Sequence, residues 1–102
     1  MSNLNIRLDK NKLERATYVL KCVAHPIRLS IIDLLEQNKQ LTVSELQHAL
    51  QIEQSLLSHH LTNMRDKGIV TTQRDGKNIL YFLTDNSIIR IIDCINGCKN
   101  FG

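Results

Sequence analysis

The sequence predicts a mainly α-helical domain that carries one small β-hairpin, and three observations support this. Apolar residues recur at helical spacing through the first two thirds of the chain and again near its end. Two strand-like segments, residues 69–74 and 77–83, flank the dipeptide Asp75-Gly76, which is a strong signal for a tight hairpin turn. The 102 residues, with no internal repeat and no linker rich in proline, glycine or serine, amount to a single domain.

Composition argues against several classes of protein. The longest apolar runs are too short to span a membrane, and the N-terminus lacks the shape of a signal peptide. Three cysteines are too few for a disulfide scaffold, so we expect a reducing cytoplasmic compartment. The sequence shows no glycine-rich phosphate loop and no nucleophile–base motif, so we expect neither an enzyme nor a bound cofactor. The net charge of +3 permits an anionic partner without requiring one.

Four helices are expected before the hairpin. The first covers residues 10–24, and the second begins at Pro26, which suits the first position of a helix. Residues 41–43 form a short extended piece, after which Ser44 opens the third helix with the capping-box pattern Ser44-x-x-Gln47. The fourth helix runs from about residue 55 to residue 67, and Gly68 is well suited to end it.

A last helix, which begins after Thr84 or Asp85, is unusually apolar. It carries five isoleucines within eight positions, residues 88–95. These are too many for one narrow stripe, so this helix must be covered on more than one side. Because a chain of 102 residues cannot hide so much apolar surface by itself, we expect a homodimer.

The order of the elements predicts a winged helix-turn-helix. The third and fourth helices are joined by about four residues, as in a helix-turn-helix, and the hairpin that follows is the wing. We assign residues 1–9 to a flexible N-terminal tail and residues 10–102 to the winged helix-turn-helix domain.

The polar face of the fourth helix is suited to duplex DNA. It carries short side chains that can form hydrogen bonds with base edges. It carries no carboxylate, which would repel the neighbouring phosphates. Basic residues follow at the helix end and at the hairpin tip. The candidate DNA-binding residues are Gln54, Ser55, Ser58, His59, His60, Thr62, Asn63, Arg65, Arg74 and Lys77.

The role of His60 is open: it either contacts DNA or supports the helix from behind. Two other interpretations of the whole face are possible. In the first, the face is the solvated side of a structural domain. A winged-helix module that binds protein instead of DNA would need an apolar or acidic face, and Ser58, His59 and Asn63 argue against it.

Several segments together resemble the ArsR/SmtB family of bacterial repressors. Residues 24–35, which include Ala24-His25-Pro26-Ile27-Arg28, resemble its second-helix signature, and residues 41–46 resemble the start of its third helix. Residues 54–65 resemble its recognition helix, and residues 68–83 are similar to its wing. The resemblance implies a homodimer formed through the first and last helices, which binds double-stranded operator DNA and is released by an inducer.

The metal sites of that family are not matched. Thr42, Val43 and Ser44 stand where one family site has Cys-Val-Cys. Where the other site has carboxylate and imidazole ligands, the chain has Asp85, Ser87, Cys98 and Phe101, and these do not supply the four ligands that zinc needs. We therefore expect no conventional metal site.

Thiol chemistry is the remaining candidate for an inducer site. In the family fold the first and last helices pack together, so Cys22, Cys94 and Cys98 could converge. Three thiolates would suit arsenite or another soft ion, and two could form an oxidant-dependent bridge. The alternative is that Cys22 and Cys94 are small packing residues and that Cys98 has no role.

Overall fold

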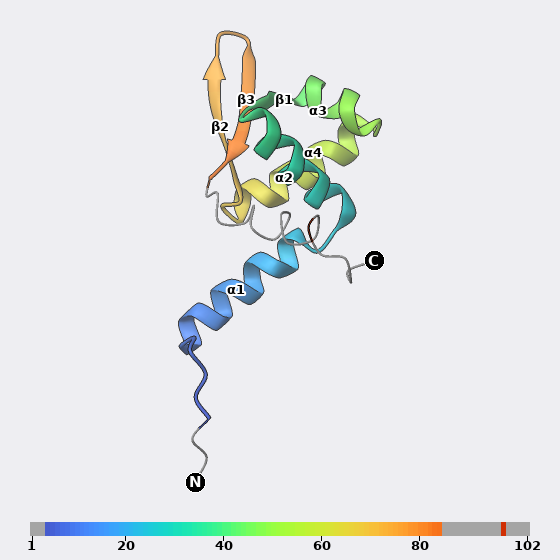
Figure 1. Ribbon diagram of the computed structural model, residues 1–102. Coiled ribbons are helices and arrows are strands. Elements are labelled where there is room, and N and C mark those ends of the chain that lie inside the picture. Colours follow the sequence, from blue (N-terminus) through green and yellow to red (C-terminus); the bar gives the residue numbers. More distant parts are fainter. Residues whose placement is uncertain (1–3, 85–96, 98–102) are drawn as a thin grey trace.

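The computed structural model describes residues 4–84 and residue 97 (Figure 1). In chain order its elements are α1 (Lys10–Val23), α2 (Pro26–Asn38), β1 (Leu41–Thr42), α3 (Val43–Leu50), α4 (Gln54–Asp66), β2 (Val70–Asp75) and β3 (Asn78–Leu83). Helices α2, α3 and α4 and the sheet form one body, from which α1 projects. The predicted fold class, a mainly α domain with a hairpin wing, is confirmed. The predicted last helix, with Cys94 and Cys98, lies outside the described residues.

The first two helices begin where local chemistry favours a start. Asp9 caps α1, because its side chain accepts a hydrogen bond from the backbone N–H of Lys12 at 2.8 Å. Pro26 occupies the first turn of α2, as predicted. His25 caps that helix, with its Nδ1 accepting from the N–H of Ile27 at 3.1 Å. The junction between α1 and α2 is therefore short and well defined.

Helix α3 begins one residue earlier than predicted, and its capping box uses different residues. Thr42 is extended, and its hydroxyl accepts from the N–H of Glu45 at 3.1 Å, while the Glu45 carboxylate accepts from the N–H of Thr42 at 2.9 Å. The predicted pair Ser44 and Gln47 was wrong because Ser44 already lies inside the helix. The observed pair also places a negative charge in the first turn, where the helix dipole favours it.

The wing is a three-stranded antiparallel sheet in the order β1-β3-β2. Strand β1 was predicted only as an extended piece, but it pairs with β3 through Leu41 and Tyr81. Asp75 pairs with Asn78, so the central turn residues are Gly76 and Lys77, one position later than predicted. Among these two only Gly76 has a positive φ, at 63°, which is the pattern of a type II′ turn and not of type I′.

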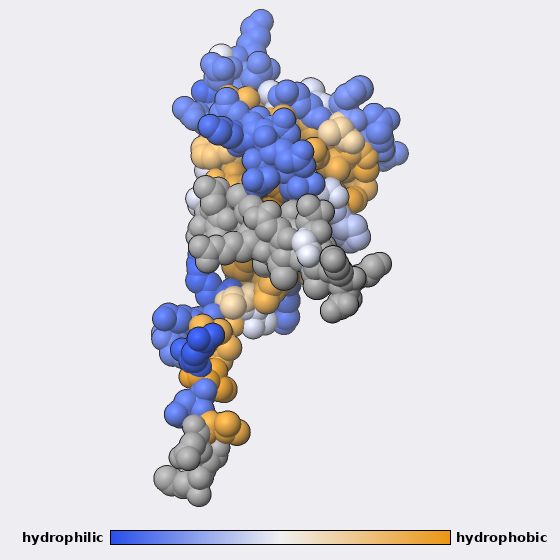
Figure 2. All heavy atoms as spheres, viewed as in Figure 1, coloured by the Kyte–Doolittle hydropathy of each residue, from blue (hydrophilic) through white to orange (hydrophobic). Residues whose placement is uncertain are grey.

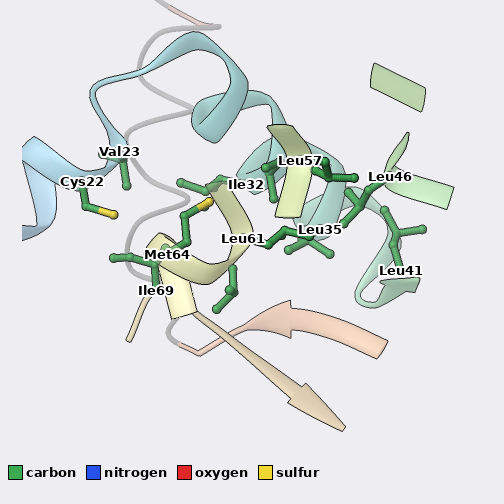
Figure 3. Packing of buried hydrophobic residues seen from close by; sticks show 12 residues of the cluster. Cys22, Val23, Ile32, Leu35, Leu41, Leu46, Leu57, Leu61, Met64 and Ile69 are labelled. Carbon is green, nitrogen blue, oxygen red and sulfur yellow. The ribbon is translucent and has the colours of Figure 1, made fainter. Parts of the chain in front are cut away.

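The core lies where α2, α3, α4 and the sheet meet (Figure 3). Its fully buried members include Ile31, Ile32 and Leu35 of α2 together with Leu46 of α3. Helix α4 contributes its own apolar stripe, and Ile69 and Val70 continue the core into the wing; the stripe consists of Leu57, Leu61 and Met64. Because this stripe faces inward, the opposite face of α4 faces out.

Gly68 joins α4 to the wing. Its φ of 75° is a conformation that side chains with a Cβ rarely adopt. Two hydrogen bonds close the helix end: Gly68 N–H to the Arg65 carbonyl at 3.0 Å, and Ile69 N–H to the Met64 carbonyl at 2.9 Å. These are the two bonds of a Schellman motif, so the predicted role of Gly68 is confirmed.

Helix α1 is largely uncovered by the described part of the chain. Cys22 and Val23 at its end are buried, but Leu13, Tyr18 and Leu20 are 40–50% exposed. Figure 2 shows apolar surface along this projecting segment. None of the helices in the described residues is both long and apolar enough to cross a membrane.

The capping of α3 can be tested with one pair of variants. Thr42→Ala should lower the free energy of unfolding by about 1 kcal/mol, because the N–H of Glu45 loses its acceptor. Ser44→Ala, at the position predicted from sequence, should change it by less than about 0.5 kcal/mol. Urea denaturation followed by circular dichroism measures both. Equal losses in the two variants would contradict the assignment of Thr42 as the cap.

Candidate nucleic-acid interface

Helices α3 and α4 form a helix-turn-helix. Three residues, 51–53, connect them. The first of these, Gln51, ends α3 in the left-handed conformation with φ of 55°, and its N–H donates to the Gln47 carbonyl at 2.8 Å. This abrupt end allows α4 to start immediately in a new direction.

The outer face of α4 presents most of the predicted DNA-binding side chains to solvent. Its exposed polar members among the predicted residues are Gln54, Ser55, Ser58, His59, Thr62 and Arg65. Hydroxyl, amide and imidazole groups can donate and accept hydrogen bonds, as base edges require, and none of these side chains repels phosphate. The acidic residues stand at the two ends of the helix: Glu53 precedes its first residue, and Asp66 is its last.

The wing supplies two further cations. Arg74 near the end of β2 and Lys77 in the turn are both exposed. Strand β2 follows α4 after only three residues, so α4 and the wing are rigidly connected. The structure thus joins a polar helix face to a basic hairpin.

His60 lies on the inner face of α4 and not on the outer one. Its side chain is 4% exposed. Its Nδ1 accepts a hydrogen bond from Nε of Arg28 at 3.0 Å. The inclusion of His60 among the DNA contacts was therefore wrong, and the alternative of a supporting role fits the structure. A neighbouring position on a helix is rotated by about 100°, which separates His60 from the exposed His59.

Asn63 is half-buried and also turned inward. Its Oδ1 accepts from Nη1 of Arg28 at 3.0 Å and lies 3.7 Å from the sulfur of Cys22. A base contact through this oxygen, as the sequence suggested, does not fit because the oxygen is already engaged inside the protein. His60 and Asn63, three residues apart, share one inner edge of α4.

Arg28 of α2 connects these groups and was not singled out from the sequence. Besides His60 and Asn63, its Nη1 reaches the carbonyl oxygen of Cys22 at 2.9 Å. The guanidinium group thus joins the end of α1, the first turns of α2 and the middle of α4. The available signal was its place in the segment His25-Pro26-Ile27-Arg28, where a basic residue follows the helix start on a half-buried face.

The surroundings of His60 favour the neutral form of its ring. Burial lowers the pKa of His60, and the nearby His25, Arg28 and His59 lower that pKa further. The rings of His25 and His60 lie 4.4 Å apart, and those of His59 and His60 lie 5.7 Å apart. The neutral ring is also the form that can accept a hydrogen bond at Nδ1.

Leu56 is a further exposed residue of α4 that sequence reasoning missed, and it lies beside the edge that carries His60 and Asn63. It is 41% exposed, next to the buried Leu57. An exposed leucine among short polar groups can contact the methyl group of thymine in a major groove. Its apolar character hid it, because apolar residues in a helix are first assigned to the core.

Cys22 is buried at the contact between α1 and α4. Its side chain is 1% exposed, and its sulfur lies 3.8 Å from Nη1 of Arg28. Within the described residues, no group of three or more histidine, cysteine, aspartate or glutamate side chains could hold a metal ion. The other two cysteines of the predicted thiol site lie outside those residues.

Comparison with known proteins establishes the family. The family model described as "Bacterial regulatory protein, arsR family" matches residues 25–72, which run from the start of α2 into β2. The HTH-type transcriptional regulator YgaV of Escherichia coli K12 is 35% identical over 79 residues, which are 78% of this chain and 80% of that protein. This chain belongs to the arsR family of bacterial regulatory proteins.

Other relatives agree in sequence and in structure. The transcriptional repressor PagR of Bacillus anthracis is 33% identical over 90 residues, 88% of this chain and 90% of that protein. Its crystal structure aligns with a TM-score of 0.79 over 86% of this chain and 100% of that chain. HlyU from Vibrio cholerae aligns with a TM-score of 0.77 at 32% identity, over 87% and 95% of the two chains.

These findings confirm the resemblance to ArsR/SmtB winged-helix repressors. The protein is a DNA-binding transcriptional regulator of the arsR family. Helix α4 is the second helix of its helix-turn-helix, the element that such proteins place in the major groove.

Proposed function

We propose that this regulator represses transcription by reading an operator duplex with the outer face of α4 and gripping the backbone with its wing. The observation that carries the proposal is the division of α4 into two faces: a buried apolar stripe and an exposed face that carries no carboxylate between Gln54 and Arg65. Ser58 and His59 make contacts with bases, and Leu56 contacts a thymine methyl group. Arg65, Arg74 and Lys77 contact phosphates.

Repression is supported by the name of one relative, whereas HlyU of Vibrio cholerae is named a transcriptional activator. PagR is named a transcriptional repressor, and YgaV is named a transcriptional regulator. The protein acts in the cytoplasm, as a regulator and not as an enzyme, and an inducer releases it from DNA. A module that binds only protein is less well supported, because the exposed face of α4 is mainly polar and has a single acidic group, Asp66, at its end.

The wing cations can be tested through the salt dependence of binding. Arg74→Ala and Lys77→Ala should each weaken binding to every duplex and lower the slope of log affinity against log salt by about one per bound copy of the chain, because each removes one phosphate contact from each copy. Lys10→Ala removes the same charge from the distant start of α1 and should leave the slope unchanged. Fluorescence anisotropy at several salt concentrations measures the slope. Unchanged slopes in both wing variants would contradict the role of the wing.

The regulator acts as a homodimer in this proposal. Helix α1 exposes Leu13 and Leu20 on one side and Tyr18 on another, and the sequence after Thr84 carries five isoleucines. A second copy covers these apolar residues and sets two α4 helices about 34 Å apart, at successive major grooves. A palindromic operator follows from the twofold symmetry of such a dimer.

Dimer formation can be tested on α1. Leu20→Glu places a charge on the apolar side and should raise the dimer dissociation constant by at least about tenfold, because the carboxylate would have to be desolvated. Lys12→Glu introduces the same side chain on the exposed start of the helix and should leave the constant within about threefold. Analytical ultracentrifugation measures both. A wild-type protein that is monomeric at micromolar concentration would overturn the proposal.

We assign inducer sensing to Cys22, Cys94 and Cys98. Cys22 is packed between α1 and α4, so any modification of its sulfur must shift α1 relative to the DNA-reading helix. In a bridge, two thiols lose two protons and two electrons to an oxidant and form one S–S bond. In the soft-ion alternative, three thiols replace the three hydroxyl groups of arsenous acid, which leave as water, and form three As–S bonds.

Operator binding with and without a thiol reagent tests this assignment. Oxidant, a persulfide donor or arsenite should weaken wild-type binding about 5- to 150-fold, the usual range of allosteric coupling. The double variant Cys94→Ser, Cys98→Ser should bind equally in every condition. Equal affinity of the wild type in all conditions would leave the cysteines as packing residues.

A further inference from the structure

We propose that Arg28 is a positioning residue for sequence reading, and that it holds α4 in its reading orientation through the unprotonated Nδ1 of His60. The inference rests on the assignment of the outer face of α4 to base contacts, made above. Arg28 would thus affect the sequence specificity of binding from the inner side of α4, without contacting DNA itself.

The geometry makes Arg28 a three-way connection. Nε donates to His60 Nδ1 at 3.0 Å, and Nη1 donates to Asn63 Oδ1 at 3.0 Å, so two directions of one planar fork hold one edge of α4. Nη1 also donates to the carbonyl of Cys22 at 2.9 Å, which fixes the fork to the end of α1. Among the residues that the structure describes, no other polar side chain joins α1, α2 and α4 in this way.

These bonds restrain rotation of α4 about its own axis. The apolar stripe of Leu57, Leu61 and Met64 holds the helix against the core, but apolar contacts are not directional. A rotation of 10° would move a side chain about 5–6 Å from the helix axis by about 1 Å. That shift is enough to break a hydrogen bond to a base edge, whose useful distances span only about 0.5 Å.

Loss of this restraint should therefore affect specific and non-specific binding differently. Contacts of Arg74 and Lys77 with phosphate depend mainly on charge and tolerate small displacements. Contacts of Ser58 and His59 with bases require direction. A residue that merely stabilised the fold would lower both kinds of binding together, whereas a positioning residue lowers the ratio between them.

The restraint also depends on pH. The groups that face His60 are His25 from the start of α2, Arg28 from α2 itself and His59 from α4, and all of them are basic. Together with burial they lower the pKa of His60 below its ordinary value of 6.5. The unfolded chain therefore takes up this proton at a higher pH than the folded one. The contribution of the Arg28–His60 bond is complete above pH 6.5 and is lost as the pH falls through the lowered pKa, because the protonated ring cannot accept.

The first experiment compares Arg28→Lys with the wild type on two duplexes of equal length. One duplex is selected by the wild type from a random pool, and the other has the same bases in scrambled order. A lysine keeps the charge but cannot reproduce the planar fork. We expect affinity for the selected duplex to fall about tenfold or more, and affinity for the scrambled duplex to stay within about twofold. Arg15→Lys, at an exposed position of α1, is the matched control and should change neither.

The second experiment follows the ratio of the two affinities from pH 7.5 to pH 5.5. The wild-type ratio should fall about tenfold, because the protonated ring no longer accepts from Arg28 and α4 loses one of its restraints. His60→Asn retains an acceptor near the position of Nδ1 without titrating, so its ratio should stay within about twofold. His48→Asn, on the exposed side of α3, should keep the wild-type fall.

Circular dichroism confirms that each variant is folded under the binding conditions. If Arg28→Lys does not fold, the pH dependence of His60→Asn decides. An equal loss on both duplexes, or no loss, in folded Arg28→Lys would overturn the proposal, as would a His60→Asn ratio that falls like the wild type. Failure of Ser58→Ala to weaken the selected duplex would instead contradict the assignment of the base contacts.

Discussion

Burial of one apolar stripe of α4 against α2 is the constraint on which the rest of this structure depends. Leu57, Leu61 and Met64 are almost fully buried, and each contributes on the order of 1.5–3 kcal/mol by leaving water. This packing decides which side of α4 is buried. The opposite side is therefore exposed and available to DNA. It also fixes the start of the wing, since Ile69 and Val70 continue the same core.

A polar connection lies at the edge of that apolar packing. Directional hydrogen bonds join Arg28 to His60 and to Asn63 in a region where most neighbours are apolar. Within the described residues, no buried side-chain nitrogen or oxygen lacks a hydrogen-bond partner, so the polar groups are fully used. Satisfied networks of this kind add specificity of arrangement to a core that would otherwise allow small rotations.

Helix α1 is the element whose packing the described chain leaves incomplete. Its end is anchored by Cys22 and Val23, while Leu13 and Leu20 remain open to solvent. The anchored end touches the same arginine that holds α4. A second copy that covers α1 would therefore be linked to the DNA-reading helix through few intervening groups, which is the physical requirement for coupling an inducer to operator release.

The sequence alone determined the order of the elements, the helix-turn-helix with its wing, and the exposed positions Ser58, His59 and Arg74. Local signals suffice for these, since Pro26, Gly68 and the apolar spacing act within a few residues. Tertiary structure decided what depends on distant partners. His60 and Asn63 turned out to be inward groups because Arg28, more than thirty residues earlier, supplies their hydrogen bonds. The cap of α3 and the turn of the wing shifted by one or two residues, because pairing with β3 sets the register of both and no local pattern records that pairing.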